Sequence, residues 1–118
     1  MFKQVTLLTT EGPKEFPMLA NGATAIRYRQ VFHQDLMAGI AKFSRLNEDP
    51  DSVDWDLPAK LGYIMNAAAD DKQDMNKLSQ DGFMTWVEQF EGDTLWNAQD
   101  AISSVYLVSQ QVTSTGKK

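Results

Sequence analysis

The chain has no cysteine and only one histidine, His33, among its 118 residues. Without cysteine there is no disulfide, no thiolate zinc site, no iron–sulfur cluster and no cysteine nucleophile. A single histidine also excludes metal sites that need several imidazoles and mechanisms that need a histidine pair. Ordinary enzyme chemistry is therefore disfavoured, and we expect a protein that is not an enzyme.

Long apolar runs are missing as well. A membrane-spanning helix needs about 20 predominantly apolar residues in a row, and the sequence holds no such stretch. Residues 1–8 carry neither a sustained hydrophobic region nor the small-residue cleavage site of a secretory signal. We therefore expect no membrane partner and a cytoplasmic location.

What the chain does contain is typical of one globular domain. Hydrophobic residues make up 42% of it and charged residues 23%, which is not the composition of a disordered chain. A single domain typically has about 100–150 residues. We expect one domain over residues 1–112, with a hairpin region at 1–20 and a helical body at 22–112. Residues 113–118 are polar and are expected to form a flexible tail.

Charge is distributed unevenly along the chain. Residues 1–45 hold six basic and three acidic groups, whereas residues 46–118 hold five basic and thirteen acidic groups, which gives the net charge of -5. An acidic surface repels phosphate backbones, so nucleic-acid binding is disfavoured. Three interpretations stay open: head-to-tail self-association, docking of a basic partner, or a solvated acidic face that aids solubility.

Local patterns predict a mainly α (α+β) fold with four to five helices after a short N-terminal β-hairpin. Residues 3–9 and 14–19 are β-prone and flank a turn over residues 11–14 that contains Gly and Pro. Apolar residues recur at helical spacing in five later segments. These segments are residues 23–32, 34–46, 56–68, 81–90 and 95–111.

Capping signals mark several of these boundaries. Asn21 or Thr24 can cap the first helix and Asp35 the second, so residues 33–35 form either a kink or part of a continuous helix. Asp56 followed by Pro58 marks the start of the third helix. Asp81 is the expected cap of the fourth.

Two aromatic stripes and one arginine pair are the candidate partner-binding residues. Each stripe either offers apolar surface to a partner or belongs to the core of a chain this small. The arginine pair either binds an anion or forms the solvated side of a helix. The stripes are Tyr28, Phe32, Leu36 and Phe83, Trp86, Phe90, and the pair is Arg27 and Arg29.

Patterns for cofactors and catalysis are absent from the sequence. Residues 48–56 contain five carboxylates, but a calcium loop starting at Asp49 would place Val53, Asp54 and Lys60 at positions that need other residues. His33 lies two residues from Asp35, which is not a neighbouring position on a helix. Glycine-rich nucleotide motifs and a serine nucleophile elbow are lacking. We expect no metal, no cofactor and no catalytic residue.

One segment carries a family resemblance. Residues 20–32, followed by Asp35 and Leu36, show a small residue, then Thr-x-Ile-Arg-Tyr, a basic residue, Phe, and Asp-Leu. This run of about 17 residues resembles the opening of tail assembly chaperones from long-tailed siphophages and prophages of Gram-positive hosts. The cysteine-free helical body and the acidic second half fit the same family.

The resemblance implies a function in binding and assembly rather than in catalysis. Such chaperones bind the long helical tape-measure protein in the host cytoplasm, keep it soluble, help recruit the major tail protein, and are absent from the mature virion. Two other classes stay open: a structural head–tail connector or minor tail protein, and a small hydrolase in which His33 would meet carboxylates in a cleft.

Overall fold

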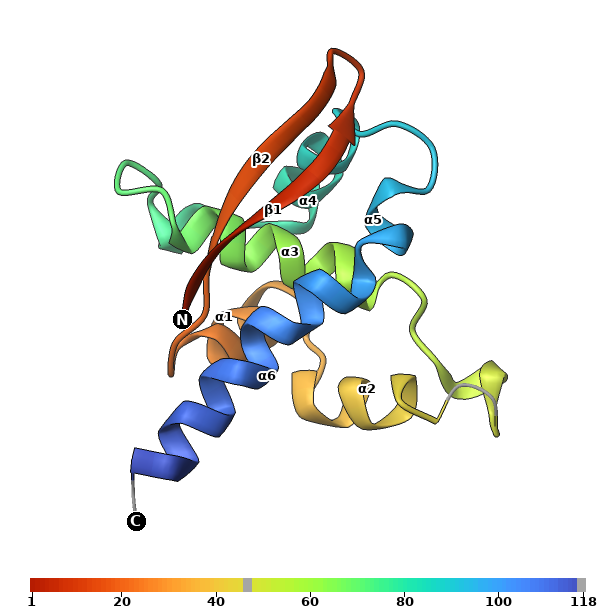
Figure 1. Cartoon of the computed structure of the whole chain (residues 1–118), viewed down its shortest axis with the longest axis vertical. Coiled ribbons are helices and arrows are strands. Elements are labelled where there is room, and N and C mark those ends of the chain that lie inside the picture. Colours follow the sequence, from red (N-terminus) through yellow and green to blue (C-terminus); the bar gives the residue numbers. More distant parts are fainter. Residues whose placement is uncertain (46–47, 117–118) are drawn as a thin grey trace.

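The structure is a computed structural model that describes residues 1–45 and 48–116, with side chains described up to Ser109. A long β-hairpin lies across a set of helices arranged around helix α3 (Figure 1). The predicted mainly helical α+β class with an N-terminal hairpin is confirmed, although the described residues form six α-helices rather than four or five. The elements are β1 (Phe2–Thr9), β2 (Gly12–Leu19), α1 (Thr24–Phe32), α2 (Leu36–Phe43), η1 (Pro50–Ser52), α3 (Leu57–Ala68), η2 (Met75–Lys77), α4 (Gln80–Val87), α5 (Thr94–Asn97) and α6 (Gln99–Gly116).

The hairpin buries one face by strict alternation. Its strands pair antiparallel in a register that places Val5 opposite Phe16, and both side chains are buried. The turn lies earlier than predicted, because Gly12 and Pro13 already belong to β2. Gly12 has a φ of 111°, a conformation that favours glycine, so it serves the chain reversal from the first position of the strand.

Both edges of the hairpin are protected. Pro13 and Pro17 lie four residues apart on β2, so one edge lacks two N–H donors. The Asn66 side chain on α3 donates to the Pro17 carbonyl at 2.9 Å. On the other edge, residues 89–94 bond to the end of β1, where Glu91 N–H donates to the Leu8 carbonyl at 2.9 Å. At these positions another strand cannot be added.

Helix α3 forms the centre of the core. Its apolar residues Leu57, Leu61, Ile64 and Met65 are buried, and so is Tyr63. The helix is covered on more than one side because β2, α1, α4, α5 and α6 all pack against it. Its position fixes where every other element can lie.

The chain breaks between α1 and α2, which decides between the two predicted alternatives. His33 ends α1 in the left-handed conformation with a φ of 56°. Asp35 caps α2 as predicted, because its carboxylate accepts the backbone N–H groups of Met37 and Ala38. At the start of α1 the prediction of Asn21 or Thr24 as the cap is wrong, because the N-cap position is Ala23 and no side chain accepts an N–H of the first turn. Asn21 and Thr24 instead bond within the turn before the helix, where Asn21 Oδ1 accepts Ala23 N–H and Thr24 Oγ1 accepts Asn21 N–H.

The C-terminal third differs from prediction at three boundaries. Ser79 caps α4 instead of Asp81, because its hydroxyl accepts Gly82 N–H at 2.9 Å and Asp81 lies inside the first turn. The single helix predicted at 95–111 is divided at Ala98 into α5 and α6. Helix α6 continues to Gly116, so residues 113–116 are helical where a tail was predicted, and residues 117–118 lie outside the described residues. The sequence has neither Gly nor Pro between Gly92 and Gly116 to stop propagation.

Replacing Gly82 with alanine tests the packing of α4 on α3. A Cβ at Gly82 would lie 2.5 Å from the Tyr63 hydroxyl oxygen, and the Tyr63 ring is held among Phe32, Phe83 and Trp86. We expect Gly82→Ala to lower the free energy of unfolding by about 1–3 kcal/mol, as overpacking does, although alanine favours a helix by about 1 kcal/mol. Urea unfolding measures the change. Gly22→Ala, where nothing lies within 4 Å of the new Cβ, is the control, and an equal effect in the two variants would contradict the packing argument.

Candidate functional site

The first predicted stripe belongs to the core. Tyr28, Phe32 and Leu36 are 1%, 8% and 1% exposed. The rings of Tyr28 and Phe32 pack in a tilted arrangement with their centroids 5.2 Å apart, and the ring of Phe32 also packs edge-on against that of Phe83 at 5.2 Å. A partner cannot contact these three side chains unless the domain opens, so they offer no docking surface.

The second stripe joins α4 to the hairpin. Phe83, Trp86 and Phe90 are partly buried against the core. The rings of Trp86 and Phe90 lie 4.7 Å apart, and Phe90 lies 5.1 Å from Phe16 of β2. Trp86 Nε1 donates to Asn66 Oδ1 at 3.0 Å. Packing within the domain therefore accounts for most of this stripe, although Phe83 also borders a surface groove.

The two arginines do not act as a pair. Arg27 Nη1 donates to Asn76 Oδ1 at 3.0 Å, which connects α1 to the segment of η2. Arg29 is exposed in the last turn of α1, where a cation is favoured by the helix dipole. Residues two apart on a helix point in different directions, so the two side chains form no joint anion site.

The histidine and the carboxylates do not assemble into a reactive centre in the described part of the chain. His33 is exposed at the junction of α1 and α2. In residues 1–45 and 48–116, no three His, Asp or Glu side chains lie together as metal ligands would. None of the helices described there is both long and apolar enough to cross a membrane.

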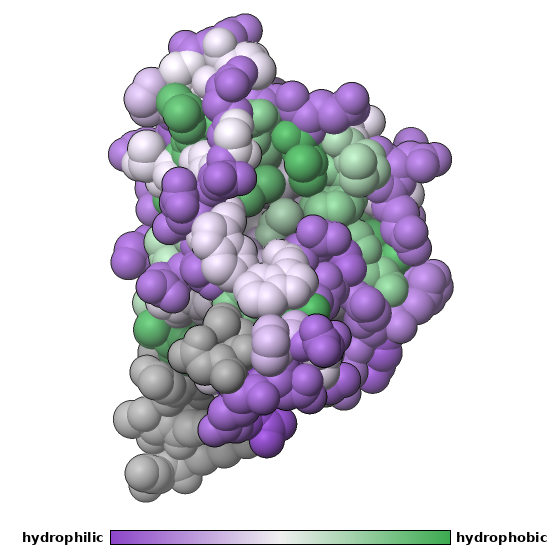
Figure 2. Space-filling model, turned by 90° about the vertical axis from the view of Figure 1, so that its right-hand side faces the viewer, coloured by the Kyte–Doolittle hydropathy of each residue, from purple (hydrophilic) through white to green (hydrophobic). Residues whose placement is uncertain are grey.

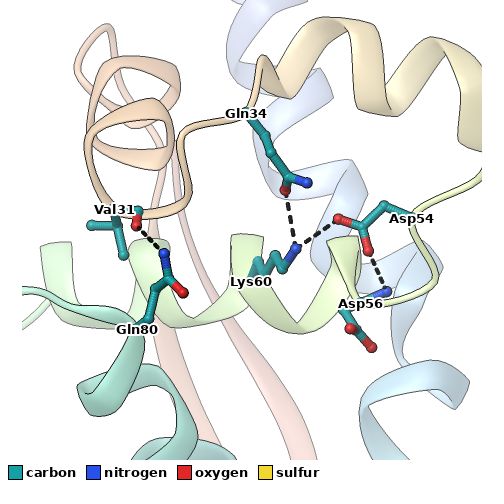
Figure 3. Close-up of polar contacts among 6 residues, drawn as sticks. All are labelled: Val31, Gln34, Asp54, Asp56, Lys60 and Gln80. Carbon is teal, nitrogen blue, oxygen red and sulfur yellow. Dashed lines mark hydrogen bonds and ion pairs between the residues drawn. The ribbon is translucent and has the colours of Figure 1, made fainter.

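A polar network around Lys60 resembles a cluster of reactive groups, but its hydrogen bonds and ion pair join separate elements of the fold (Figure 3). Lys60 Nζ lies 2.8 Å from Asp54 Oδ2 and 3.0 Å from Gln34 Oε1, and it lies 5.4 Å from the centre of the Phe32 ring. The second oxygen of Asp54 accepts Asp56 N–H at 3.0 Å. One ammonium on α3 thus fixes both the junction of α1 and α2 and the loop that leads into α3.

A surface depression beside α3 offers no arranged set of polar groups for a ligand. It has a volume of about 460 Å³ and lies between Tyr63 and residues 69–73. Its inner polar groups are already paired, because Asn66 bonds to both Trp86 and the Pro17 carbonyl. They do not converge on a ligand.

An apolar groove on another face is the strongest candidate for function. It has a volume of about 350 Å³ and lies between the start of α3, helix α4 and helix α5. Figure 2 looks onto the side of the molecule that carries α5 and shows hydrophobic atoms gathered there between hydrophilic ones. The larger apolar residues of its lining are Trp55, Phe83, Met84, Val87, Leu95 and Trp96, and Pro58 and Ala59 also line it.

Large side chains stand exposed at this groove. Trp55, Met84 and Trp96 are 46%, 57% and 37% exposed. The rings of Trp55 and Trp96 lie 5.3 Å apart, and Phe43 of α2 contacts both, at 6.3 and 5.8 Å between centroids. Exposed aromatic clusters of this kind are typical of protein-binding surfaces. The groove has the shape and chemistry to hold apolar side chains of another protein.

Sequence reasoning missed this groove. Trp55 lies in the acidic loop at residues 48–56, which the sequence pattern excludes as a calcium site without indicating another role, and Trp96 lies where one long helix was predicted. The two indoles are 41 positions apart in the sequence, so only the fold brings them together. A signal was present nonetheless, since a tryptophan among five carboxylates has no helical stripe to explain it.

Comparison with protein-family models, with curated proteins and with solved structures gave no match to this chain.

Removing the Lys60 ammonium is expected to destabilise the fold. The Lys60 and Asp54 side chains are only 16% and 28% exposed, so Lys60→Met leaves a largely buried carboxylate without its partner. We expect a loss of about 1–3 kcal/mol in the free energy of unfolding, measured by urea denaturation. Lys42→Met, at an exposed position of α2, should change it by less than about 0.5 kcal/mol. Adding Asp54→Asn to Lys60→Met should cost less than the sum of the single changes, and strict additivity would argue against the pairing.

Tyr28 makes stability sensitive to alkaline pH. Burial raises the pKa of its hydroxyl far above the ordinary value of 10.0, and the charges of Asp54 and Asp56 raise it further. Below pH 10 both folded and unfolded chains keep the proton, whereas above it only the unfolded chain loses it. Stability therefore falls as pH rises above 10. We expect Tyr28→Phe to lose less stability than the wild type between pH 8 and pH 11 in urea titrations; parallel losses in the two proteins would refute this role.

Proposed function

We propose that this protein is a phage tail assembly chaperone that binds a helical segment of the tape-measure protein through the groove formed by Trp55, Met84 and Trp96. The observation that carries the proposal is the exposed pair of indoles beside a groove of about 350 Å³. Tryptophan is the residue most often found at the energetic centre of protein interfaces. An amphipathic helix whose apolar face enters a groove is a recurrent mode of recognition.

The residues of the resemblance support the family's fold more than its binding surface. Ala20, Thr24, Tyr28, Phe32 and Leu36 are all at least 91% buried. Asp35 caps α2, whereas Ile26, at 49% exposure, and Arg29 lie on the outside of α1. Most of the family-like run is thus explained by the packing of α1 and by the break that follows it. The groove offers apolar surface for a partner outside this run.

A chaperone of this kind would act by covering apolar surface. A tape-measure protein exposes helical apolar stripes until the tail tube encloses it, and such stripes aggregate. The groove would bind one segment of a stripe, and the flexible Met84 side chain would adapt to different apolar residues. Many copies along the tape measure would keep it soluble in the host cytoplasm, and assembly of the major tail protein would displace them before the virion matures.

Co-expression with the tape-measure protein of the same genome tests the proposal. We expect the tape measure to become soluble and to co-purify with the wild-type chain. Trp55→Ala and Trp96→Ala should each reduce the recovered complex at least tenfold, because truncation of a central aromatic residue typically costs 2 kcal/mol or more. The control is Leu107→Ala on α6, since Leu107 is 38% exposed but does not line the groove.

Circular dichroism of each variant separates a lost interface from a lost fold. A tape measure that stays insoluble beside well-folded wild-type protein would contradict the proposal. Detection of this chain in purified virions at a fixed, ring-sized copy number would instead favour a head–tail connector or minor tail protein.

A further inference from the structure

We propose that the groove selects a basic amphipathic helix, whose apolar side chains pack on Trp55, Met84 and Trp96 while its Lys or Arg side chains face the carboxylates of Asp56 and Asp93. This inference rests on the proposed function only in taking a helix as the occupant. The charge of that helix is argued from the groove itself.

The groove has an acidic border. Asp56 and Asp93 belong to its lining, which contains no lysine, arginine or histidine. On α4, Asp81 lies three residues before Met84 and Glu88 lies four residues after it, so all three occupy one face of the helix, and all three are exposed. Two carboxylates therefore border the apolar floor, and two more add negative charge on the face of α4 that carries Met84.

Few positively charged side chains of the chain are available to neutralise these carboxylates. From Leu78 to Gly116 the sequence contains five acidic residues and no Lys, Arg or His. Within the described residues, neither Asp56 nor Asp93 forms an ion pair. The nearest lysine along α3, Lys60, is already bound to Asp54 and Gln34, and the Asp56 carboxylate points away from it (Figure 3). The negative potential at the groove is thus available to a partner.

Charge around an apolar site governs selectivity more than total affinity. Opposite charges across an interface steer association and exclude wrong partners, and like charges repel. Each exposed pair is worth a factor of about 1.5–5 in affinity, so two pairs at Asp56 and Asp93 predict a combined factor of about 2–25. Because exposed charges are screened over about 8 Å at physiological ionic strength, the preference should weaken as salt is added.

Three labelled model helices test the inference on the full chain. They share leucines at positions i, i+4 and i+7 and differ only in their polar positions, which are all lysine, all glutamine or all glutamate. Fluorescence anisotropy at 50 and 300 mM NaCl gives each affinity. We expect the lysine helix to bind most tightly, the glutamate helix most weakly, and the gap between them to shrink at the higher salt concentration.

Matched variants locate the effect. Asp56→Asn combined with Asp93→Asn should weaken binding of the lysine helix about 2- to 25-fold. Glu11→Gln combined with Asp71→Asn removes the same charge at exposed positions outside the groove and should leave that affinity within a factor of two. Trp96→Ala should weaken all three helices together, because it removes part of the shared apolar floor.

Several outcomes would overturn the inference: equal affinity for the lysine and glutamate helices, equal loss in the two double variants, or no binding of any helix. Sedimentation that shows a dimer dissociated by Trp96→Ala would mean that a second copy covers the groove. The proposed function fails separately, if the lysine helix is selected through Asp56 and Asp93 but the tape measure does not co-purify. Co-purification that depends on Trp55 and Trp96, without any charge selection, would leave the function standing and refute the inference.

Discussion

Covering α3 is the constraint on which the rest of the structure depends. Eight of its twelve residues are buried, including Leu61, Ile64 and Met65 with almost no exposed surface. A helix that is apolar on most of its circumference has to be enclosed by other elements. The hairpin, α1, α4, α5 and α6 each cover part of it. Short elements that are marginal in isolation thereby become stable together.

The need to cover α3 also explains where apolar side chains remain exposed on the surface. The aromatic residues of α1 and most of those of α4 are used to cover α3 and to pack the hairpin. Trp55 and Trp96 lie at the end of α3 where the covering elements are shortest, since α5 is a single turn. Apolar side chains that the core does not enclose collect at this end. The groove is thus a by-product of the same packing, placed where a partner can reach it.

The features that could be predicted from the sequence are those that interactions between neighbouring residues determine. The hairpin, the cap at Asp35 and the start of α3 beside Pro58 follow from turn chemistry, capping and the preference of proline for the first turn of a helix, which act within a few residues. The break at His33 and the division at Ala98 were not decided locally, because they depend on which surfaces the following helices must reach. The groove was beyond prediction for the same reason. Its two indoles come from a loop and a single helical turn, and neither segment has a periodicity that reveals its partner.

The distribution of indoles gives the molecule an internal optical reporter. Two of its three tryptophans, Trp55 and Trp96, lie partly in water at the groove, whereas Trp86 is partly buried outside the groove and donates to Asn66. Indole emission moves to shorter wavelength when water is displaced from the ring. Occupancy of the groove would therefore shift the emission of two chromophores against a nearly constant third, so binding can be followed in the unlabelled protein.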